Sequence, residues 1–320
     1  MRYVLAPLAG FTDAPFRRLC HEGGADLTYT EMVSAAGLAH GSAPTRRLMD
    51  LMPGEGPVAV QLFGSKEEEL AFAVKTLPPG FVEVNLNAGC PMTKVTREGA
   101  GAKLVEDPDK IYRLLKAMVD NTSLPVTLKT RLGPRPGWAT AFEILDAAEK
   151  AGAKGIAVHA RYTSQMHGGE LHLDTLAELV SRSRIPVAGN GSVVDRATAD
   201  AMASTGVASI MIGRAALRDP AIFSRLKGEP SPVAGASSVD VAELHLSYIL
   251  EFRDLLARRY PDAHIPSPDG LASVKMHTHL FRYFGGRPGA AALRARLNTV
   301  RTVAEINRII AACRQEVSGA

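Results

Sequence analysis

The chain has few cysteines and no sign of a metal-binding framework. Its three cysteines, Cys20, Cys90 and Cys313, are far apart in the 320 residues, and none belongs to a CxxC pair. This spacing argues against a disulfide scaffold, an iron–sulfur cluster or a structural zinc site, and it fits a reducing compartment. We therefore expect no metal.

Long hydrophobic runs and export signals are also missing. The sequence contains no run of about 18 apolar residues, the length that a helix needs to cross a bilayer. The first residues, "MRYVLAPLAGFTDAPFRR", have too short an apolar run for a signal peptide and lack a small-residue cleavage site. We expect a cytoplasmic protein with no membrane partner.

Charge is small in total but uneven along the chain. The net charge is +4; residues 240–320 contribute 11 Lys and Arg against 8 Asp and Glu, or +3, and residues 1–239 contribute 26 against 25, or +1. No acidic residue occurs between positions 270 and 304. The cations in that window are Lys275, Arg282, Arg287, Arg294, Arg296 and Arg301. A window of one sign this long predicts a polyanionic partner.

Short apolar runs alternate with amphipathic helical patterns over the first 226 residues. The runs predict strands at 3–6, 27–30, 58–63, 81–86, 126–129, 155–159, 187–188 and 209–212. Helical patterns between them include 66–75, 107–119, 139–150, 175–181 and 195–204. Eight such units favour a (β/α)₈ TIM barrel. No glycine-rich dinucleotide fingerprint follows the first strand, which argues against a Rossmann domain.

The remainder of the chain reads as helical. Residues 227–238, "KGEPSPVAGASS", are rich in proline, glycine and serine and predict a linker. Helical patterns follow at 240–260, 271–284, 290–298 and 303–317. We expect a barrel domain at 1–226, a linker at 227–238 and an all-α domain at 239–320, which carries the basic window.

Polar residues follow nearly every predicted strand. Because barrel chemistry takes place at the C-terminal ends of the strands, these residues are the candidate site. They are Gln61, Asn85, Asn87, Cys90, Lys129, Arg131, His159, Arg161, Asn190, Gly191, Ser192, Gly213 and Arg214, with Pro7, Leu8 and Ala9 after the first strand.

The loops after the seventh and eighth strands indicate a phosphate site. Gly189, Gly191 and Gly213 allow backbone to approach an anion, and Arg214 adds a charge-assisted bond. Gln61 suits the imide edge of a flat polar ring, and Lys129 suits the negative charge of a reduced flavin. These residues favour FMN as the ligand.

Seven stretches resemble, in order, the tRNA-dihydrouridine synthase family. They are "LAPLAGFTDAPFRRLC", "VAVQLFGS", "VEVNLNAGCPMTKV", "VTLKTR", "GIAVHAR", "IPVAGNGSV" and "SIMIGRAALRDPAIF". The resemblance spans residues 1 to about 226, is looser in the tail, and is nearest to the bacterial B branch. It implies an FMN-containing barrel with a C-terminal helical domain. Such enzymes reduce the 5,6 double bond of particular uridines in tRNA, and NADPH recharges the flavin.

The resemblance also implies roles for individual residues. Cys90 would be the catalytic acid and His159 would lie near the FMN phosphate. The implied FMN contacts are Pro7, Leu8, Ala9, Gln61, Lys129, Asn190, Gly191, Ser192, Gly213 and Arg214. Two positions depart from the family pattern: Ser192 stands where the family more often has aspartate, and "HAR" with Tyr162 replaces the commoner "HGRT".

The chemistry explains a cysteine on a strand-end loop. A hydride added to C6 of uracil leaves charge that a proton at C5 must neutralise, and a neutral thiol with a pKa near ~8.5 suits that donor role. Gly89 is expected to allow a tight turn beside it. We expect Asn87, Arg131 and Arg161 to contact the substrate in the barrel, and the tail cations Lys275, Arg282, Arg287 and Arg294 to contact tRNA.

Two other functions fit parts of the sequence. A flavoenzyme acting on a free pyrimidine or a dihydroorotate-type substrate would share the barrel and the loop cysteine, but it would not need the basic tail. A non-enzymatic RNA-binding module would keep the tail without a flavin. We expect a monomeric tRNA-modifying oxidoreductase, with Cys20 and Cys313 in structural positions.

Overall fold

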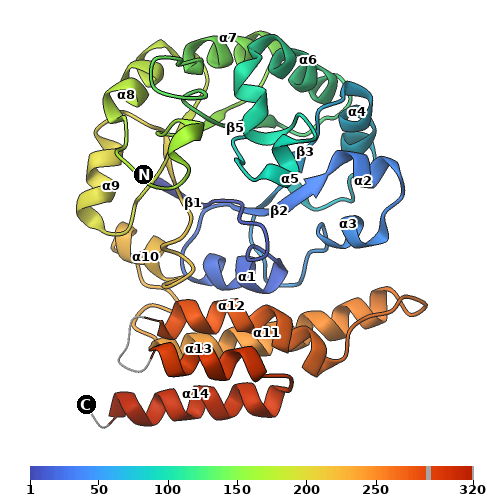
Figure 1. Cartoon of the computed structure of the whole chain (residues 1–320), viewed down its shortest axis with the longest axis vertical. Coiled ribbons are helices and arrows are strands. Elements are labelled where there is room, and N and C mark those ends of the chain that lie inside the picture. The colour runs from blue at the N-terminus through green and yellow to red at the C-terminus, as the bar shows by residue number, and fades with distance from the viewer. Residues whose placement is uncertain (286–289, 319–320) are drawn as a thin grey trace. The chain divides into compact units, whose positions relative to one another are not determined.

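A computed structural model describes residues 1–285 and 290–318 and contains a barrel of eight parallel strands (Figure 1). The strands are β1 Arg2–Leu5, β2 Thr28–Ser34, β3 Val58–Phe63, β4 Phe81–Ala88, β5 Val126–Arg131, β6 Ile156–His159, β7 Val187–Asn190 and β8 Ser209–Ile212. They pair in the order β1-β8-β7-β6-β5-β4-β3-β2. A parallel bridge between Val4 and Leu27, with the Leu5 N–H donating to the Leu27 carbonyl at 2.9 Å, joins the two ends. The predicted (β/α)₈ barrel is confirmed.

Helices connect the strands and lie outside them. Those of the barrel are α2 Ala35–Ala39, α3 Ala43–Arg47, α4 Glu67–Lys75, α5 Thr93–Thr96, α6 Pro108–Val119, α7 Ala141–Ala151, α8 Leu173–Arg182 and α9 Arg196–Ala203, with 3₁₀ turns η1 Gly101–Glu106 and η2 Thr163–Gln165. Local chemistry sets their ends. Asp107 caps α6 by accepting from the Lys110 N–H at 2.9 Å, and Gly152 ends α7 in the left-handed conformation with φ 90°.

The barrel interior is apolar in one part and polar in another. Val4, Tyr29, Ala157 and Met211, from β1, β2, β6 and β8, meet in one buried cluster, so these side chains point inward. On β4 the buried apolar residues Val84, Leu86 and Ala88 alternate with the polar residues 83, 85 and 87. Since alternate residues of a barrel strand face opposite sides, β4 presents its polar residues to the interior.

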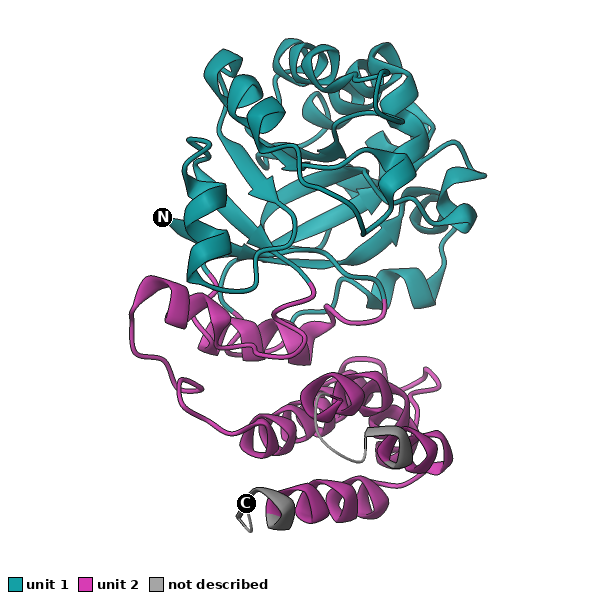
Figure 2. Ribbon diagram, turned by 60° about the vertical axis from the view of Figure 1, so that its left-hand side comes forward, with its two compact units in different colours: residues 1–9, 26–51, 56–213 teal, residues 10–25, 52–55, 214–320 magenta. Residues whose placement is uncertain are grey.

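The chain forms two compact units (Figure 2). The first is Met1–Ala9, Asp26–Leu51 and Gly56–Gly213; the second is Gly10–Ala25, Met52–Glu55 and Arg214–Ala320. The second unit therefore includes segments that precede residue 226, so the sequence-based domain limits stay a prediction. Between α10 Ile222–Lys227 and α11 Ser238–Arg259 the chain has neither helix nor strand, as the composition of the linker indicates.

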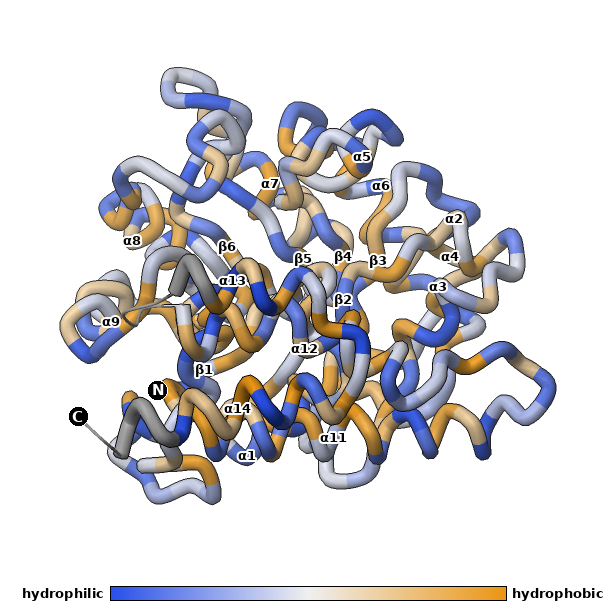
Figure 3. Tube along the Cα trace, turned by 60° about the horizontal axis from the view of Figure 1, so that its bottom comes forward, coloured by the Kyte–Doolittle hydropathy of each residue, from blue (hydrophilic) through white to orange (hydrophobic). Residues whose placement is uncertain are grey.

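The second unit is helical and buries several polar groups. Its helices are α1 Ala14–Glu22, α10, α11, α12 Pro268–Phe284, α13 Ala290–Thr299 and α14 Val303–Ser318. Hydrophobic and hydrophilic segments alternate along α11 and α14 (Figure 3), the pattern of helices with one packed face. On α1, the buried Arg17 guanidinium pairs with the buried Glu55 carboxylate at 2.6 Å. Opposite charges thus neutralise each other inside this unit.

Candidate functional site

A ladder of buried amides crosses the barrel near the ends of β3 and β4. Gln61 Nε2 donates to Asn85 Oδ1 at 2.7 Å, and Asn87 Nδ2 donates to Gln61 Oε1 at 2.8 Å. Asn85 Nδ2 donates in turn to Thr127 Oγ1 at 2.7 Å. Beyond these bonds, Gln61 and Asn85 each keep a second N–H and a second lone pair, whereas Asn87 Oδ1 already accepts two backbone bonds from the loop after β4. The ladder therefore presents fixed hydrogen-bonding groups to a polar ring.

The Cys90 loop is shaped by Asn87. Asn87 Oδ1 accepts hydrogen bonds from the backbone N–H groups of Gly89, at 3.2 Å, and Cys90, at 3.0 Å. The Cys90 carbonyl accepts from the Ala102 N–H of η1 at 2.8 Å. The half-buried Cys90 is thus held on both sides. The substrate contact expected of Asn87 is untested, but its oxygen positions the loop.

The glycine that this loop requires is Gly101 rather than Gly89. A Cβ on Gly89 would lie 3.4 Å from the Thr130 backbone, an ordinary contact, and its φ is not in the left-handed region. Gly101 has φ 59°, and a Cβ there would lie 2.6 Å from the Cys90 carbonyl oxygen. Only glycine allows η1 to approach Cys90 this closely. The paired glycines of "GAGAK" at 99–103 are the sequence feature that could have predicted this close approach.

Arg131 joins the loops that follow β4 and β6. Its side chain is 2% exposed; Nε donates to the Gly89 carbonyl at 2.8 Å and a terminal nitrogen donates to the Tyr162 carbonyl at 3.3 Å. Burial lowers the pKa of Arg131 to about 10, although Cys90 acts in the opposite direction. The substrate contact expected of Arg131 stays a prediction; two of its five N–H donors already bond to the protein backbone.

Arg161 makes a similar connection between the loops after β6 and β7. Its guanidinium donates to the Gly169 carbonyl, at 2.8 Å from the nearer nitrogen, and to Ser192 Oγ at 2.9 Å. It also lies 3.3 Å from His159 Nε2. The commoner aspartate at position 192 would offer Arg161 a charge, and the serine offers a neutral oxygen instead.

Lys129 lies at the end of β5 and bonds to a neutral oxygen. Its Nζ donates to Asn190 Oδ1 at 3.2 Å, and Asn190 Nδ2 donates to the Met211 carbonyl at 2.7 Å. Burial, followed by the neighbouring charge of Arg131, lowers the pKa of Lys129 to about 7. Burial and the nearby cations, Lys129 first, also hold the pKa of His159 far below its usual value. His159 is therefore a neutral imidazole.

These strand ends hold positive charge without a matching carboxylate. Within residues 1–285 and 290–318, the partners of Lys129 and Arg131 are an amide oxygen and two backbone carbonyls. Buried charges in proteins are normally paired, because desolvation of an unpaired charge is costly. The arrangement is typical of a site that receives an anionic ligand.

The loop after β7 has a backbone suited to an anion. Gly191 has φ 137°, and a Cβ there would lie 2.6 Å from Leu171 and 3.1 Å from the His159 ring. Ser192 has φ 49°, a left-handed conformation that non-glycine residues rarely adopt. Positive φ at two successive residues makes a tight backbone turn that a ligand can approach closely. Asp195 caps α9 at its start, so the helix end itself is already satisfied.

The other glycines of the expected phosphate site differ from this one. A Cβ on Gly189 would lie 2.5 Å from the Met202 sulfur of α9, so this glycine makes room for the methionine. Gly213 has room for a Cβ at 3.6 Å from Ala6. Leu8, after β1, is at 3.7 Å from the same point, so the ends of β1 and β8 lie together. Pro7 and Leu8 are half-buried and Ala9 is exposed.

Arg214 is exposed and is the first residue of the last segment of the second unit. Its expected phosphate contact stays a prediction.

The cations of the tail differ in their exposure and in their partners within the protein. Lys275 forms an ion pair with Asp13 at 3.1 Å. Arg282 and Arg294 are exposed, and their guanidinium carbons lie 5.8 Å from the Phe11 ring centroid and 4.4 Å from that of Phe281. Arg287 lies outside the described residues. Lys275 therefore has a carboxylate partner within the protein, and the tRNA contacts expected of Lys275, Arg282 and Arg294 stay predictions.

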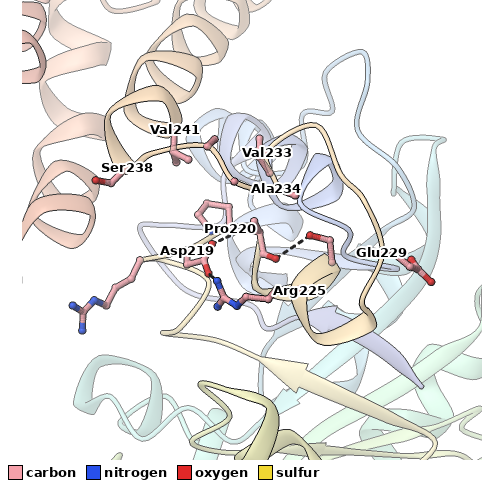
Figure 4. A pocket seen from close by; sticks show the side chains of 13 residues that line it. Asp219, Pro220, Arg225, Glu229, Val233, Ala234, Ser238 and Val241 are labelled. Carbon is pink, nitrogen blue, oxygen red and sulfur yellow. Dashed lines mark hydrogen bonds and ion pairs between the residues drawn. The ribbon is translucent and has the colours of Figure 1, made fainter. Parts of the chain in front are cut away.

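The second unit also contains a cavity of about 480 Å³ beside the segment that joins α10 and α11 (Figure 4). Its lining includes Asp219, Arg225, Glu229 and Val233, and none of the residues expected at the site. In the described part of the chain no helix is long and apolar enough to cross a membrane, and no group of three or more His, Cys, Asp or Glu side chains could hold a metal.

Known proteins resemble this chain over most of its length. The model of a family described as "Dihydrouridine synthase (Dus)" matches residues 4–317. A "Probable tRNA-dihydrouridine synthase" of Treponema pallidum (strain Nichols) is 36% identical over 260 residues, which are 75% of this chain and 76% of the relative. "tRNA-dihydrouridine synthase B" of Escherichia coli (strain K12) is 35% identical over 263 residues, covering 79% of this chain and 80% of the relative.

Solved structures support the fold. "Morphinone reductase" matches with a TM-score of 0.51 at 14% sequence identity, over 72% of this chain and 86% of that chain. At this identity the likeness concerns the architecture of the barrel alone.

Proposed function

The chain belongs to the dihydrouridine synthase family, and from this premise we propose that it reduces the 5,6 double bond of particular uridines in tRNA. FMN is the proposed cofactor, NADPH the reductant and Cys90 the proton donor. The proposal places the enzyme in the cytoplasm, where its tRNA substrate is found, and treats it as a monomer without a metal.

The observation that carries this proposal is the uncompensated positive charge beside Cys90. Lys129 and Arg131 bond to neutral oxygens, and the lowered pKa of Lys129, about 7, reflects its burial without a counter-ion. A bound anion would raise that pKa and offset the cost of burial. A flavin that carries a phosphate, and gains charge when reduced, suits this environment.

The residues present fit FMN. The amide ladder, with Gln61 at its centre, would meet the polar edge of the ring, and Lys129 would lie beside the ring system. The backbone at Gly191 and Ser192 would receive the phosphate, next to the neutral His159. When bound, FMN would supply the hydride that adds to C6 of uracil.

Cys90 supplies the other hydrogen. Its thiol proton passes to C5 of the ring, and the thiolate then takes a proton from solvent. Asn87 and the Ala102 N–H fix the backbone of Cys90, so the thiol is held in one place when the base arrives. Arg131 fixes the Gly89 carbonyl directly before it. The target base must leave its stack to reach this depth, which is least costly for an unpaired nucleotide.

The test uses purified protein and unmodified tRNA. We expect the purified protein to show the visible absorption band of a flavin. Under anaerobic conditions NADPH should bleach this band and unmodified tRNA should restore it. The RNA should then contain dihydrouridine. Restoration by a free pyrimidine and not by tRNA would favour the alternative flavoenzyme. Purified protein that neither contains flavin nor binds added FMN would exclude an enzyme of this class and leave an RNA-binding module.

A further inference from the structure

Three consecutive loops at the C-terminal ends of the strands expose large apolar side chains. Met92 follows β4 and is 57% exposed, Trp138 follows β5 and is 42% exposed, and Met166 follows β6 and is 44% exposed. We call Met92, Trp138 and Met166 the rim. Single exposed apolar residues are ordinary, but three on neighbouring loops around Cys90 indicate a contact surface.

The three loops are bonded to one another. The Thr163 and Ser164 N–H groups donate to the Gly133 and Pro134 carbonyls, at 2.9 and 3.0 Å, which joins the loops after β5 and β6. Thr140 Oγ1 donates to the Val105 carbonyl of η1 at 2.7 Å. Because η1 also holds Cys90 through Ala102, the loop after β4 belongs to the same network. The loops that carry the rim are therefore held in fixed positions relative to one another.

The backbone at the rim adopts restricted conformations. Gly133 has φ 141°, and a Cβ there would lie 2.6 Å from the Trp138 carbonyl oxygen. Met166 has φ 54° and ψ −105°, which is unfavourable for a residue with a side chain. Strained residues of this kind persist where surrounding bonds impose them, and they cluster at functional sites.

The loop segments that carry the rim are basic, although the exposed residues Glu98 and Glu170 directly follow two of them. Residues 89–97, 132–140 and 162–169 include no Asp or Glu; the first acids after them are Glu98, Glu143 and Glu170. Their exposed ionisable side chains are Lys94, Arg97, Arg135 and His167. The guanidinium carbon of Arg135 lies 5.6 Å from the Trp138 ring centroid. Aromatic and basic groups side by side are typical of surfaces that bind single-stranded nucleic acid.

We propose that the rim binds the unpaired nucleotides next to the target uridine, and that one base stacks on Trp138. This inference rests on the proposed function. When the target base leaves its stack, its neighbours lose a stacking partner, and an aromatic ring beside the entrance replaces it. The methionines provide adaptable apolar contacts, and Arg135 and Lys94 meet the phosphates. The position of Arg135 beside the Trp138 ring favours nucleic acid over a protein partner, which is an outcome of the test below.

Trp138 is the only tryptophan in the chain, so its fluorescence reports on the rim without any substitution. We expect unmodified tRNA to quench the tryptophan emission of the flavin-loaded protein. A short unpaired oligoribonucleotide is expected to quench it as well, and an RNA duplex much less. Unchanged emission when tRNA is demonstrably bound would overturn the proposal and leave the rim to another class of partner.

Substitution gives the second measurement. Trp138→Ala is expected to weaken tRNA binding about 5- to 150-fold, the range for loss of one base–aromatic stack, and to raise KM more than it lowers kcat. Trp138→Phe should retain most of the affinity. Phe72→Ala is the matched control, because Phe72 is also 42% exposed but lies on α4. Equal tRNA affinity of Trp138→Ala and Phe72→Ala would contradict the proposal.

The outcomes separate the two proposals. If the wild-type protein forms no dihydrouridine, the proposed function fails, whatever Trp138 does. If the wild type is active and Trp138→Ala is as active, at limiting tRNA, as Phe72→Ala, only the rim assignment fails. Flavin content and NADPH oxidation without tRNA are expected to be unchanged in all three variants, which shows that the barrel has folded.

Discussion

The two compact units give their buried and half-buried cations different hydrogen-bonding partners. In the second unit, Arg17 pairs with Glu55 at 2.6 Å and Lys275 pairs with Asp13 at 3.1 Å. In the first unit, Lys129 and Arg131 bond to an amide and to backbone carbonyls. One lysine and one arginine in each unit therefore have different partners. Those of the helical unit pair with carboxylates, and those at the strand ends of the barrel bond to neutral oxygens.

The pKa values follow this difference. Burial acts to raise the pKa of Asp13, but Lys275, with His245 and His279, holds it below its usual value. Burial and Arg131 lower the pKa of Lys129 to about 7. Along the sequence, the net positive charge is concentrated in the tail. In the structure, the cations that lack a carboxylate partner lie in the barrel. The cations without carboxylates indicate where an anion binds.

The largest expected effect belongs to Cys90. If it donates the proton, Cys90→Ala should lower the rate of flavin reoxidation by tRNA about 10²- to 10⁴-fold, the contribution of a positioned general acid. Cys90→Ser should be nearly as slow, because a hydroxyl donates reluctantly. FMN binding, tRNA binding and flavin reduction by NADPH should persist.

The controls for Cys90 are Cys20→Ala and Cys313→Ala, since both cysteines are buried. Single-turnover flavin oxidation measures all four variants. A Cys90→Ala rate within a few-fold of the wild type would remove the mechanism.

Arg131 should have the next largest effect, through the position of Cys90. Arg131→Met removes charged hydrogen bonds to the Gly89 and Tyr162 carbonyls, each of the kind that contributes about 1.5–3 kcal/mol. We expect flavin reoxidation by tRNA to slow about 10- to 100-fold. KM for tRNA should change less than kcat, because Arg131 acts on the catalytic loop. A change in KM alone would indicate that Arg131 contacts the substrate directly and does not act through the position of Cys90.

Lys129 should make the stability of the flavin-free protein depend on pH. Its pKa is lowered in the folded protein, so between pH of about 7 and 10.5 the unfolded chain binds more protons than the folded one. The free energy of unfolding should therefore rise with pH across that window, and Lys129→Met should flatten the rise. Denaturant titrations at several pH values measure this, and an equal slope in both proteins would contradict the assigned pKa.

The smallest effects are expected from the tail. Replacing Arg282 and Arg294 with Ala should reduce the slope of log affinity for tRNA against log salt by up to about 0.7–0.9 per lost phosphate contact. Lys275→Met should leave that slope unchanged and lower stability, because it leaves the buried Asp13 unpaired. NADPH oxidation without tRNA should not change in either variant. Identical salt slopes for all of these proteins would show that the tail does not bind the RNA.

Much of the fold could be predicted because the strands are apolar and well separated. Val58–Phe63 and Ser209–Ile212 have the predicted bounds, and the other six strands differ only at their ends. The short helices were missed. α2 and α3 have five residues each and α5 has four, too few to show a helical period.

The site was predictable as a set of positions but less so as a set of roles. Strand ends converge in any barrel, so Gln61, Lys129 and Cys90 could be grouped from the sequence. The bonds of Arg131 go to backbone carbonyls, and Asp13 lies far along the chain from Lys275, so neither partner leaves a sequence pattern. Trp138 was overlooked, although a single tryptophan in "GPRPGW" was a visible signal.

The most direct test of the central claim compares one lysine from each unit. FMN is titrated into flavin-free Lys129→Met and Lys275→Met proteins at a pH of about 6, below the pKa of about 7, where Lys129 is charged. We predict that Lys129→Met weakens FMN binding by about tenfold or more, the loss of one charge-assisted interaction, while Lys275→Met binds FMN like the wild type. Equal FMN affinity of the two variants would contradict the claim that the uncompensated cations of the barrel form the anion site.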